Sequence, residues 1–339
     1  MGFWSDKRVL ITGGNGFIGS WLTEKAIGMG AKATLLIRKE SPVGLASIPD
    51  AAKKATVVRG DLRDAALMER ICQEQDVILH LAAVTQVLYS IRNPQETVEV
   101  DVNGTLNILE AMRKKNDGAF LVFTSTDKVY GEPAYLPIDE NHPISAKSPY
   151  DASKLAADRL AYSYHVTYGI RESTSRCSNV IGGRDANILR AIPSFVYFLM
   201  QGRRPVIRTA GRHLRDYLYV DDAVRAIMLL AEKQEKSRGK AFNFGTGKPT
   251  SVMELGNMVA AEFGPGLEPL VQGKIVPGEI DRQYLSSKLA EQELGWKSAV
   301  PLEEGVRRAV EWYRKNPQWL EIIRRSSSHY GYDIEAIYG

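Results

Sequence analysis

A tyrosine and a lysine four residues apart could together move a proton. Tyr150 and Lys154 lie in the segment YDASK, where a long helix is predicted to follow Pro149. A spacing of four residues places both side chains on one face of a helix, one turn apart. A phenol has a pKa of about 10 and acts as a base at neutral pH only beside a positive charge, which a lysine ammonium supplies. The pair therefore predicts a general acid–base site.

An acid and an amine stand next to each other in the segment TSTDKVYG at 124–131, which contains Thr126, Asp127 and Lys128. A protonated carboxylic acid in a dry site can donate to a leaving hydroxyl. A neutral amine can remove a proton from carbon if burial and nearby positive charge lower its pKa. The alternative interpretation of Asp127 and Lys128 is a surface ion pair at the end of a strand.

Three glycines at regular spacing predict a turn that binds a pyrophosphate. Gly13, Gly16 and Gly19 lie between a predicted strand and a predicted helix near the N-terminus. One glycine permits the tight turn, one lets the backbone approach the pyrophosphate, and one lets the helix pack closely on the strand. The N-terminus of the helix then offers free N–H groups and a positive dipole end. A structural turn without a ligand is the alternative, and the strand–turn–helix context favours a dinucleotide.

The residue after the second predicted strand bears on the choice of cofactor. Dinucleotide folds usually place an acid there for the ribose hydroxyls, whereas this chain has Arg38, followed by Lys39. Because an arginine can pair with a 2′-phosphate, the sequence favours NADP, with NAD as the alternative. Asp61, in the triplet GDL at 60–62, is placed either to hold the adenine amino group or to cap a turn.

The elements that must position these residues alternate between strands and helices. Strands are predicted at 7–12, 33–37, 56–58, 77–81, 119–124 and 241–245. Such alternation implies parallel pairing through right-handed crossovers. We therefore expect an α/β fold with a doubly wound parallel Rossmann sheet and a smaller mixed α/β C-terminal domain. In the second half, helices are predicted at 188–202, 219–232, 251–263 and 302–315, a short strand at 205–208, and a charged surface loop at 233–240.

Composition excludes several other classes of protein. The 339 residues are 44% hydrophobic and 25% charged, and the net charge of +4 is too small to argue for nucleic acid. Two cysteines, Cys72 and Cys177, provide no disulfide framework. No apolar run approaches the roughly 20 residues of a membrane helix, and no signal peptide is present. None of the five histidines has metal-ligand spacing, and His80 reads as a core residue. We expect a cytoplasmic protein without a metal and without nucleic-acid or membrane partners.

Together, these motifs resemble the extended short-chain dehydrogenase/reductase superfamily, the NAD(P)-dependent nucleotide-sugar epimerases and dehydratases. The resemblance covers about residues 7–315. The segments that carry it are TGGNGFIG at 12–19, GDL at 60–62, HLAA at 80–83, DVNGTLNILEA at 101–111, YDASK at 150–154, RCSNVIGG at 176–183, RDYLYVDD at 215–222 and LGW at 294–296.

The resemblance implies two sets of binding residues. Those expected to contact the cofactor are Gly13, Asn15, Gly16, Phe17, Ile18, Gly19, Arg38, Asp61, Leu62, Leu81, Ala82, Ala83, Thr124, Tyr150 and Lys154. Those expected to contact a nucleotide-hexose substrate are Gln86, Asn179, Arg215 and Arg282. The resemblance also implies a homodimer built through a four-helix bundle.

The segment Thr126-Asp127-Lys128 points to one branch of this superfamily. Its 4,6-dehydratases carry Thr-Asp-Glu here, and Asp-Lys is similar to the CDP-glucose 4,6-dehydratases. By that resemblance Tyr150 and Lys154 oxidise the sugar at C4, Lys128 removes the C5 proton, and Asp127 protonates the departing 6-hydroxyl. The product would be a 4-keto-6-deoxy sugar. The alternatives are an NDP-sugar 4-epimerase or decarboxylase, which need no acid at position 127, and a non-catalytic NADP-sensing protein.

The domain organisation expected from the resemblance divides the chain discontinuously. Residues 1–180 form the dinucleotide-binding Rossmann domain, to which 216–250 return. Residues 181–215 and 251–325 form the nucleotide-sugar-binding domain. The tail at 326–339 has no clear period.

Overall fold

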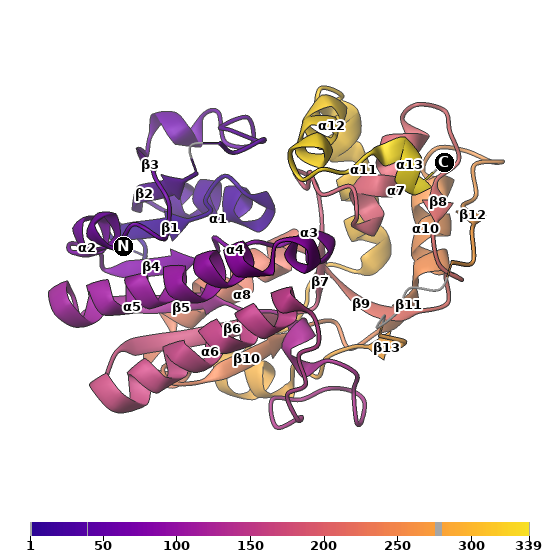
Figure 1. Ribbon diagram of the computed structural model, residues 1–339. Coiled ribbons are helices and arrows are strands. Elements are labelled where there is room, and N and C mark those ends of the chain that lie inside the picture. Colours follow the sequence, from indigo (N-terminus) through magenta and orange to yellow (C-terminus); the bar gives the residue numbers. More distant parts are fainter. Residues whose placement is uncertain (1, 39, 275–279, 339) are drawn as a thin grey trace.

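The architecture is a parallel sheet flanked by helices, with a smaller lobe at the carboxyl end of the strands. The computed structural model describes residues 2–38, 40–274 and 280–338. Seven strands form the main sheet in the order β10-β6-β5-β4-β1-β2-β3, and all their pairings are parallel (Figure 1). The strands are β1 (Arg8–Thr12), β2 (Lys32–Ile37), β3 (Thr56–Arg59), β4 (Val77–His80), β5 (Phe120–Thr124), β6 (Arg171–Cys177) and β10 (Ala241–Phe244).

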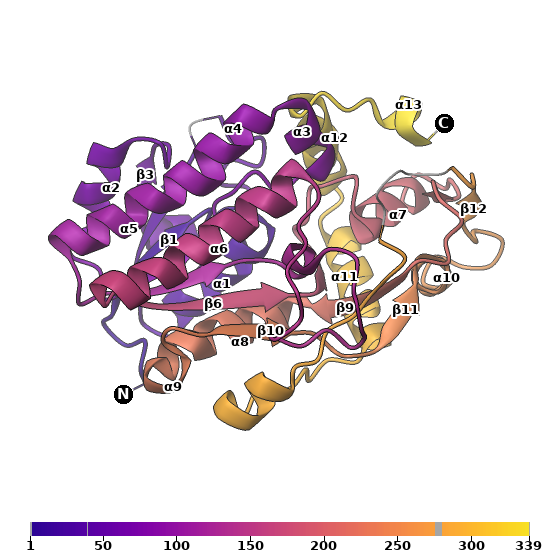
Figure 2. The same ribbon diagram turned by 60° about the horizontal axis from the view of Figure 1, so that its bottom comes forward.

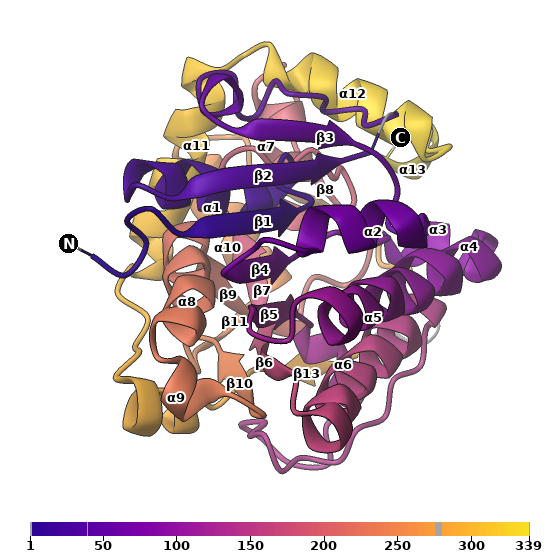
Figure 3. The same ribbon diagram turned by 90° about the vertical axis from the view of Figure 1, so that its left-hand side faces the viewer.

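Helices cover both faces of this sheet, as a parallel sheet buried on two sides requires. Figure 3 shows α1 (Phe17–Gly28) and α8 (Val220–Glu232) on one face, and α2 (Ala65–Cys72), α5 (Gly104–Lys115) and α6 (Pro149–Tyr168) on the other. The doubly wound Rossmann fold predicted from the alternation of strands and helices is confirmed.

The predicted strands are confirmed with small differences at their ends, but β6 is absent from the sequence prediction. Its sequence, RESTSRC, is polar, yet six of its seven residues are buried. The charge of Arg176 in this buried strand is compensated by an ion pair with Asp158 of α6, in which Nε and Oδ2 lie 2.9 Å apart. A buried polar strand does not show the apolar run on which such predictions rest. The loop predicted at 233–240 also contains a short helix, α9 (Gln234–Ser237).

The smaller lobe holds short strands and three main helices. Strands β11 (Pro249–Ser251), β9 (Leu214–Tyr219) and β13 (Arg282–Gln283) form one sheet, and β7 (Asn179–Ile181) also pairs with β9. Strands β8 (Val206–Ile207) and β12 (Leu270–Val271) pair separately. The helices are α7 (Ala191–Leu199), α10 (Val252–Ala261) and α11 (Leu302–Lys315).

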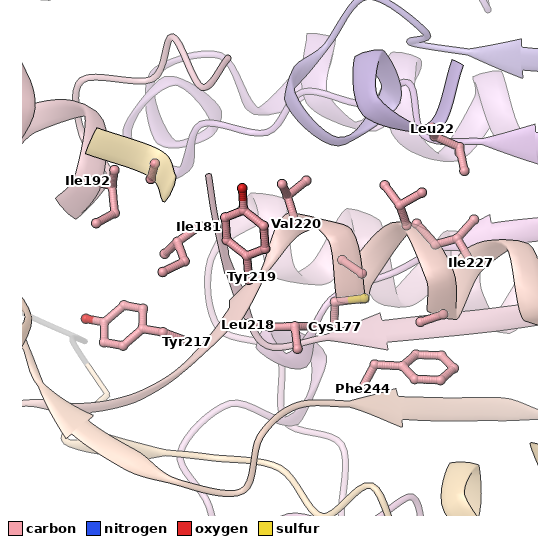
Figure 4. Packing of buried hydrophobic residues seen from close by; sticks show 14 of the residues in the cluster. Leu22, Cys177, Ile181, Ile192, Tyr217, Leu218, Tyr219, Val220, Ile227 and Phe244 are labelled. Carbon is pink, nitrogen blue, oxygen red and sulfur yellow. The ribbon is translucent and has the colours of Figure 1, made fainter. Parts of the chain in front are cut away.

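One hydrophobic core runs through both lobes. Figure 4 shows side chains of β9 and α8, among them Leu218, Val220 and Ile227, packed between Leu22 of α1 and Ile192 of α7. Residues separated by nearly 200 positions therefore share a single buried cluster. This packing fixes the position of the smaller lobe against the carboxyl edge of the main sheet.

The C-terminal residues form two further helices. Helix α12 (Trp319–His329) packs against α7, and α13 (Ile334–Tyr338) follows after a short turn. Trp319 is 2% exposed and donates from Nε1 to the carbonyl of Asp185. Most of the stretch predicted as an aperiodic tail is thus helical. Among the described residues, no helix is long and apolar enough to cross a membrane.

Candidate active site

The glycine turn has the geometry that a dinucleotide requires. Gly13 has a φ of +68°, a region that residues with a side chain rarely adopt. A Cβ atom on Gly19 would lie 2.1 Å from the Gly13 carbonyl oxygen, so only glycine allows α1 to approach the turn this closely. Helix α1 begins at Phe17 without a side-chain cap at Gly16. Its first N–H groups, which include those of Phe17, Ile18 and Gly19, are available to a phosphate.

Thr12 connects this turn to the segment after β4. Its hydroxyl oxygen accepts the backbone N–H groups of Leu81 and Ala82, both at 3.1 Å. Because that oxygen accepts twice, its own proton is directed to Nδ1 of His80, 2.7 Å away. His80 Nε2 then donates to Thr105 Oγ1 at 3.0 Å. His80 is 1% exposed, so the prediction of a core histidine is confirmed, and burial lowers its pKa to about 3.

Two further predicted cofactor residues hold loops beside the turn. Asn15 donates from Nδ2 to Ser41 Oγ at 2.9 Å and to the Gly44 carbonyl at 2.7 Å, which ties the loop after β2 to the glycine turn. Ala83 lies in the same short segment as Leu81 and Ala82 and precedes α3 (Val87–Arg92). The Thr12 hydrogen bonds, and the close approach of Gly13 to the Ala82 backbone, bring the predicted segments 13–19 and 81–83 together.

Arg38 and Asp61, two predicted cofactor residues at the carboxyl ends of β2 and β3, bind different side chains. Arg38 follows β2 directly and donates to the Tyr330 hydroxyl at 3.2 Å. Asp61 accepts from the guanidinium of Arg63 at 2.8 Å and from the Arg63 backbone N–H at 2.9 Å, so it stabilises a turn. Leu62, next to it, is 4% exposed and packs against Gly104 at the start of α5.

Helix α6 places Tyr150 and Lys154 at the carboxyl end of β5. Ser148 and Asp151 form a capping box that starts the helix, and Ser90 of α3 accepts the Tyr150 N–H at 3.1 Å. Lys154 is 4% exposed, and its ammonium lies 4.4 Å from the centre of the Phe123 ring. The start of α6 is therefore held from two sides.

The ionisation of this pair is shaped by burial. Burial lowers the pKa of the Lys154 ammonium, while the charge of Asp101 acts in the opposite direction. Burial raises the pKa of the Tyr150 phenol above its ordinary value. The largest influence that lowers it is the guanidinium of Arg190, a residue that the sequence interpretation did not select. Arg190 forms an ion pair with Asp185 at 3.1 Å, which holds it near Tyr150.

Asp127 and Lys128 form a pair in which the acid is buried and the amine is only partly exposed. They begin the short 3-10 helix Asp127–Tyr130, directly after Thr126. Asp127 is 2% exposed, and Lys128 Nζ donates to its Oδ2 at 3.1 Å. The Thr126 hydroxyl donates to the other carboxylate oxygen at 3.2 Å. The charge of Asp127 acts on the pKa of Tyr150, which shows that the acid–amine pair and the tyrosine share one electrostatic environment.

A glutamine that the sequence interpretation missed holds this pair in place. Gln283 of β13 is fully buried, and its Nε2 donates to the Asp127 carbonyl at 3.0 Å. Its Oε1 accepts from Lys128 Nζ. Burial lowers the pKa of Lys128, Asp127 raises it, and the charge of Arg215 lowers it. No motif marks Gln283, because its contact depends on the placement of β13 about 155 residues downstream.

Three buried polar atoms around these residues have no hydrogen-bond partner in the part of the chain that the structure describes. They are Thr124 Oγ1, Ser125 Oγ and Gln86 Oε1. Buried polar groups are rarely left unpaired in native proteins, so these atoms mark places where a ligand is expected to bind. Thr124 ends β5 and Gln86 precedes α3, on the same side of the sheet as the glycine turn.

The predicted substrate residues are only partly brought together. Arg215 of β9 lies near Lys128, and its guanidinium donates to the carbonyls of Leu214 and Asp281 at 2.9 and 3.3 Å. Asn179 of β7 donates to the Asp216 carbonyl at 3.4 Å. The Arg282 side chain is 64% exposed and forms an ion pair with Asp281 at 3.6 Å. Since side chains alternate along a strand, Arg282 faces away from the side on which Gln283 meets Lys128.

This arrangement fits a nicotinamide dinucleotide and supports acid–base chemistry on a ligand bound beside it. The glycine turn, the unpaired hydroxyls and the Tyr150–Lys154 pair line one region at the carboxyl edge of the sheet, where ligands bind in open α/β folds. Asp127 and Lys128 add a second proton donor and acceptor beside it.

Comparisons with known proteins agree with this geometry. Residues 10–309 match the family model described as GDP-mannose 4,6 dehydratase. A protein of Methanocaldococcus jannaschii that bears the provisional name UDP-glucose 4-epimerase is 38% identical over 312 residues, which cover 91% of this chain and 99% of the relative. A dTDP-glucose 4,6-dehydratase of Streptomyces antibioticus is 33% identical over 332 residues, which cover 94% of this chain and 96% of the relative.

A solved structure is also similar. It is a double mutant of DesIV, a dTDP-glucose 4,6-dehydratase of Streptomyces venezuelae, with NAD bound. The TM-score is 0.85 at 30% sequence identity, and the match covers 93% of this chain and 99% of the other.

Proposed function

The chain belongs to the GDP-mannose 4,6-dehydratase family of the extended short-chain dehydrogenases/reductases, and on this premise we propose that it is an NDP-hexose 4,6-dehydratase. The proposed reaction removes water from a nucleotide-hexose and leaves a 4-keto-6-deoxy sugar. It needs a base for the 4-hydroxyl, a base for the C5 proton and an acid for the 6-hydroxyl.

The observation that carries this proposal is the pair formed by buried Asp127 and by Lys128, whose side chain is 23% exposed. A surface ion pair would be solvated and of little consequence, but Asp127 is 2% exposed and acts on the titration of Tyr150. Oxidation and reduction at C4 alone need neither an acid nor an amine at this place. Buried charged groups are costly, so a pair placed beside an acid–base tyrosine is a candidate for a chemical role.

The proton transfers balance among the chain's own residues. Tyr150 accepts the proton of the 4-hydroxyl, with Lys154 stabilising the phenolate. Lys128, as a neutral amine, accepts the C5 proton, which the 4-ketone has made acidic. Asp127 donates its proton to the 6-hydroxyl, which leaves as water. Lys128 then returns a proton to C5, and the proton gained by Tyr150 restores Asp127.

We propose NADP as the cofactor, held by the glycine turn at 13–19, by Leu81 and Ala82, and by Thr124 beside the reacting ring. Its chemistry would be to take a hydride from C4 and return it to C6, so that no net oxidation occurs. The preference for NADP rests on Arg38, which follows β2 where an acid would select NAD. NAD is the alternative, and NAD is what the similar DesIV structure contains.

A CDP-hexose is the first candidate for the substrate, because Asp127-Lys128 is similar to the CDP-glucose branch. Purified protein incubated separately with CDP-, dTDP-, UDP- and GDP-hexoses, without added reductant, should give the alkaline absorbance of a 4-keto-6-deoxy sugar with one of them. Asp127→Asn should lower this rate by about 10²–10⁴-fold, the usual contribution of a general acid. Asp50→Asn is the matched control, since Asp50 forms an exposed pair with Lys53 at 3.0 Å.

Unchanged turnover in Asp127→Asn would remove this acid from the reaction. A second candidate function is a 4-epimerase, which the similarity to the Methanocaldococcus jannaschii protein favours. It predicts interconversion of two C4 epimers of one nucleotide-sugar, with no alkaline absorbance from any of the four nucleotides.

A further inference from the structure

The C-terminal segment 319–338 bridges the two lobes, and we call it the C-terminal strap. The residue after α12, Tyr330, packs its ring against that of Tyr89 in α3 of the dinucleotide-binding half, with ring centres 5.2 Å apart, while Figure 1 shows α13 near α7 of the smaller lobe. At one end Arg92 of α3 donates to the carbonyls of Gly331 and Tyr330, at 3.3 and 3.4 Å. At the other end the Tyr338 hydroxyl donates to the Ile188 carbonyl at 2.7 Å.

The strap reaches the place where the adenosine ribose of a dinucleotide binds. The Gly13 N–H donates to the Leu36 carbonyl at 3.1 Å, so the residues after β2 lie beside the glycine turn. Arg38 is two positions beyond Leu36, at the carboxyl end of β2, where Rossmann folds hold the ribose. Its guanidinium donates to the hydroxyl of Tyr330 in the strap. The strap therefore meets the residue expected to select the cofactor.

A basic cleft lies between the strap and the loop after β2. Ser41 and Pro42 line it from the loop, and Arg324, Arg325, Ser328 and His329 line it from α12. Arg324 is neutralised by Glu321, with Nε and Oε2 2.8 Å apart. Within the described ranges, no ion pair includes Arg38, Arg325 or His329. Arg325 and His329 are four residues apart, on one face of the helix.

The charges around this cleft repel one another. Burial and the charge of Arg38 lower the pKa of His329, while Glu40 of the loop and Glu96 of α4 (Pro94–Val98) act in the opposite direction. Positive groups held near each other lose this repulsion when an anion binds between them. A phosphate monoester carries close to two negative charges and three acceptor oxygens at neutral pH.

We propose that the C-terminal strap forms the second wall of a subsite for the 2′-phosphate of NADP, with Arg38 on one side and Arg325 and His329 on the other. The Tyr330 hydroxyl fixes the orientation of Arg38. This inference rests on the proposed use of NADP. It assigns cofactor selectivity to residues some 290 positions apart in the chain.

Binding of two probes to the full-length chain tests this subsite without any turnover. The probes are 2′,5′-ADP, which carries the 2′-phosphate, and 5′-ADP, which lacks it, and isothermal titration calorimetry gives both dissociation constants. Arg325→Gln and His329→Gln should each weaken 2′,5′-ADP by about tenfold, the loss expected for one charge-assisted hydrogen bond, and leave 5′-ADP unchanged. Tyr330→Phe should weaken it by about threefold. Arg307→Gln, which removes an equally exposed charge on α11, should change neither constant.

Point variants are preferable to truncation, because removing the strap would also remove Trp319 and Ile323 from the hydrophobic core. The affinity for 2′,5′-ADP should also rise as the pH falls toward 6, because burial and the charge of Arg38 lower the pKa of His329 in the free protein, and His329→Gln should abolish that rise. Equal weakening of both probes, or no change in either, would overturn the subsite. Because binding is measured without substrate, an inactive enzyme that still discriminates the two probes would refute the dehydratase and leave the subsite standing.

Discussion

At the scale of single residues, the protonation of Lys128 decides whether it can act as a base. Opposing influences act on the pKa of its amine: burial and the charge of Arg215 favour the neutral form, and Asp127 favours the charged form. Gln283 adds a neutral acceptor and, through its Nε2, holds the Asp127 backbone. Gln283 is thus a positioning residue, and its neutrality keeps a second negative charge away from the amine.

Gln283→Glu should move the pH dependence of dehydration. The new carboxylate favours the ammonium, which raises the pKa of Lys128, so a higher pH is needed to form the neutral amine. The acidic limb of kcat/KM should shift upward by about one unit, equivalent to roughly 1.4 kcal/mol of added stabilisation of the ammonium. The measurement is the pH dependence of kcat/KM, made with the nucleotide-hexose that the unmodified protein converts.

The matched control is Gln75→Glu at the end of α2, which makes the same chemical change outside the site. The pH dependence of kcat/KM in Gln75→Glu should equal that of the unmodified protein. If Gln283→Glu lowers the rate equally at every pH, Gln283 has a structural role only and the account of Lys128 as a base is wrong.

Sequence reasoning at this scale found residues that share a motif and missed those that do not. Tyr150 with Lys154, and Thr126 with Asp127 and Lys128, are neighbours in the chain, so their joint chemistry is visible in the sequence. Gln283 and Arg190 reach the site only through the tertiary fold, because no sequence motif marks them. Arg282, a phosphate candidate by the superfamily resemblance, stays a prediction, and its side chain is 64% exposed.

At the scale of elements, periodicity predicted strands and helices whose apolar residues follow a regular pattern. It failed for β6, where serines and threonines and the Arg176–Asp158 ion pair replace apolar residues in a buried strand. It also left α12 out, although Trp319, Ile322 and Ile323 bury one side of that helix. The serines at 326–328 interrupt the apolar pattern that would have marked its last turn.

The outer surface of the helices on one face of the sheet predicts a homodimer. Figure 2 shows α4, α5 and α6 side by side. Val98 of α4 is 44% exposed, and Tyr162 and Val166 of α6 are 45% and 64% exposed. Apolar side chains repeated along adjacent helices are typical of an interface. The superfamily resemblance makes a second copy of this chain the expected partner.

Val166→Glu should therefore convert a dimer into a monomer, because it places a charge where apolar side chains would meet. Sedimentation equilibrium gives the mass of each species. Val271→Glu is the control, since Val271 is also exposed, at 46%, but lies on β12 of the other lobe. A monomeric parent protein would contradict the predicted four-helix interface.

At the scale of the whole molecule, the function depends on how the two lobes meet. The main sheet supplies the glycine turn and α6, whereas β9 and β13 of the smaller lobe supply Arg215 and Gln283. The hydrophobic core around Leu218, to which both lobes contribute, fixes how the lobes pack against each other (Figure 4). The sequence motifs predict each half. The contact of β13 with Lys128 and the course of the C-terminal strap depend on pairings across more than 150 residues, which local patterns do not encode.

The central claim is that one hydrogen moves within a single sugar, from C4 to C6, while water leaves. The measurement that tests it most directly starts from the active nucleotide-hexose carrying deuterium at C4, followed by mass spectrometry and NMR of the product. The account predicts deuterium at C6 of a 4-keto-6-deoxy sugar. Deuterium that returns to C4 in a sugar that keeps its 6-hydroxyl would contradict the account and establish an epimerase instead.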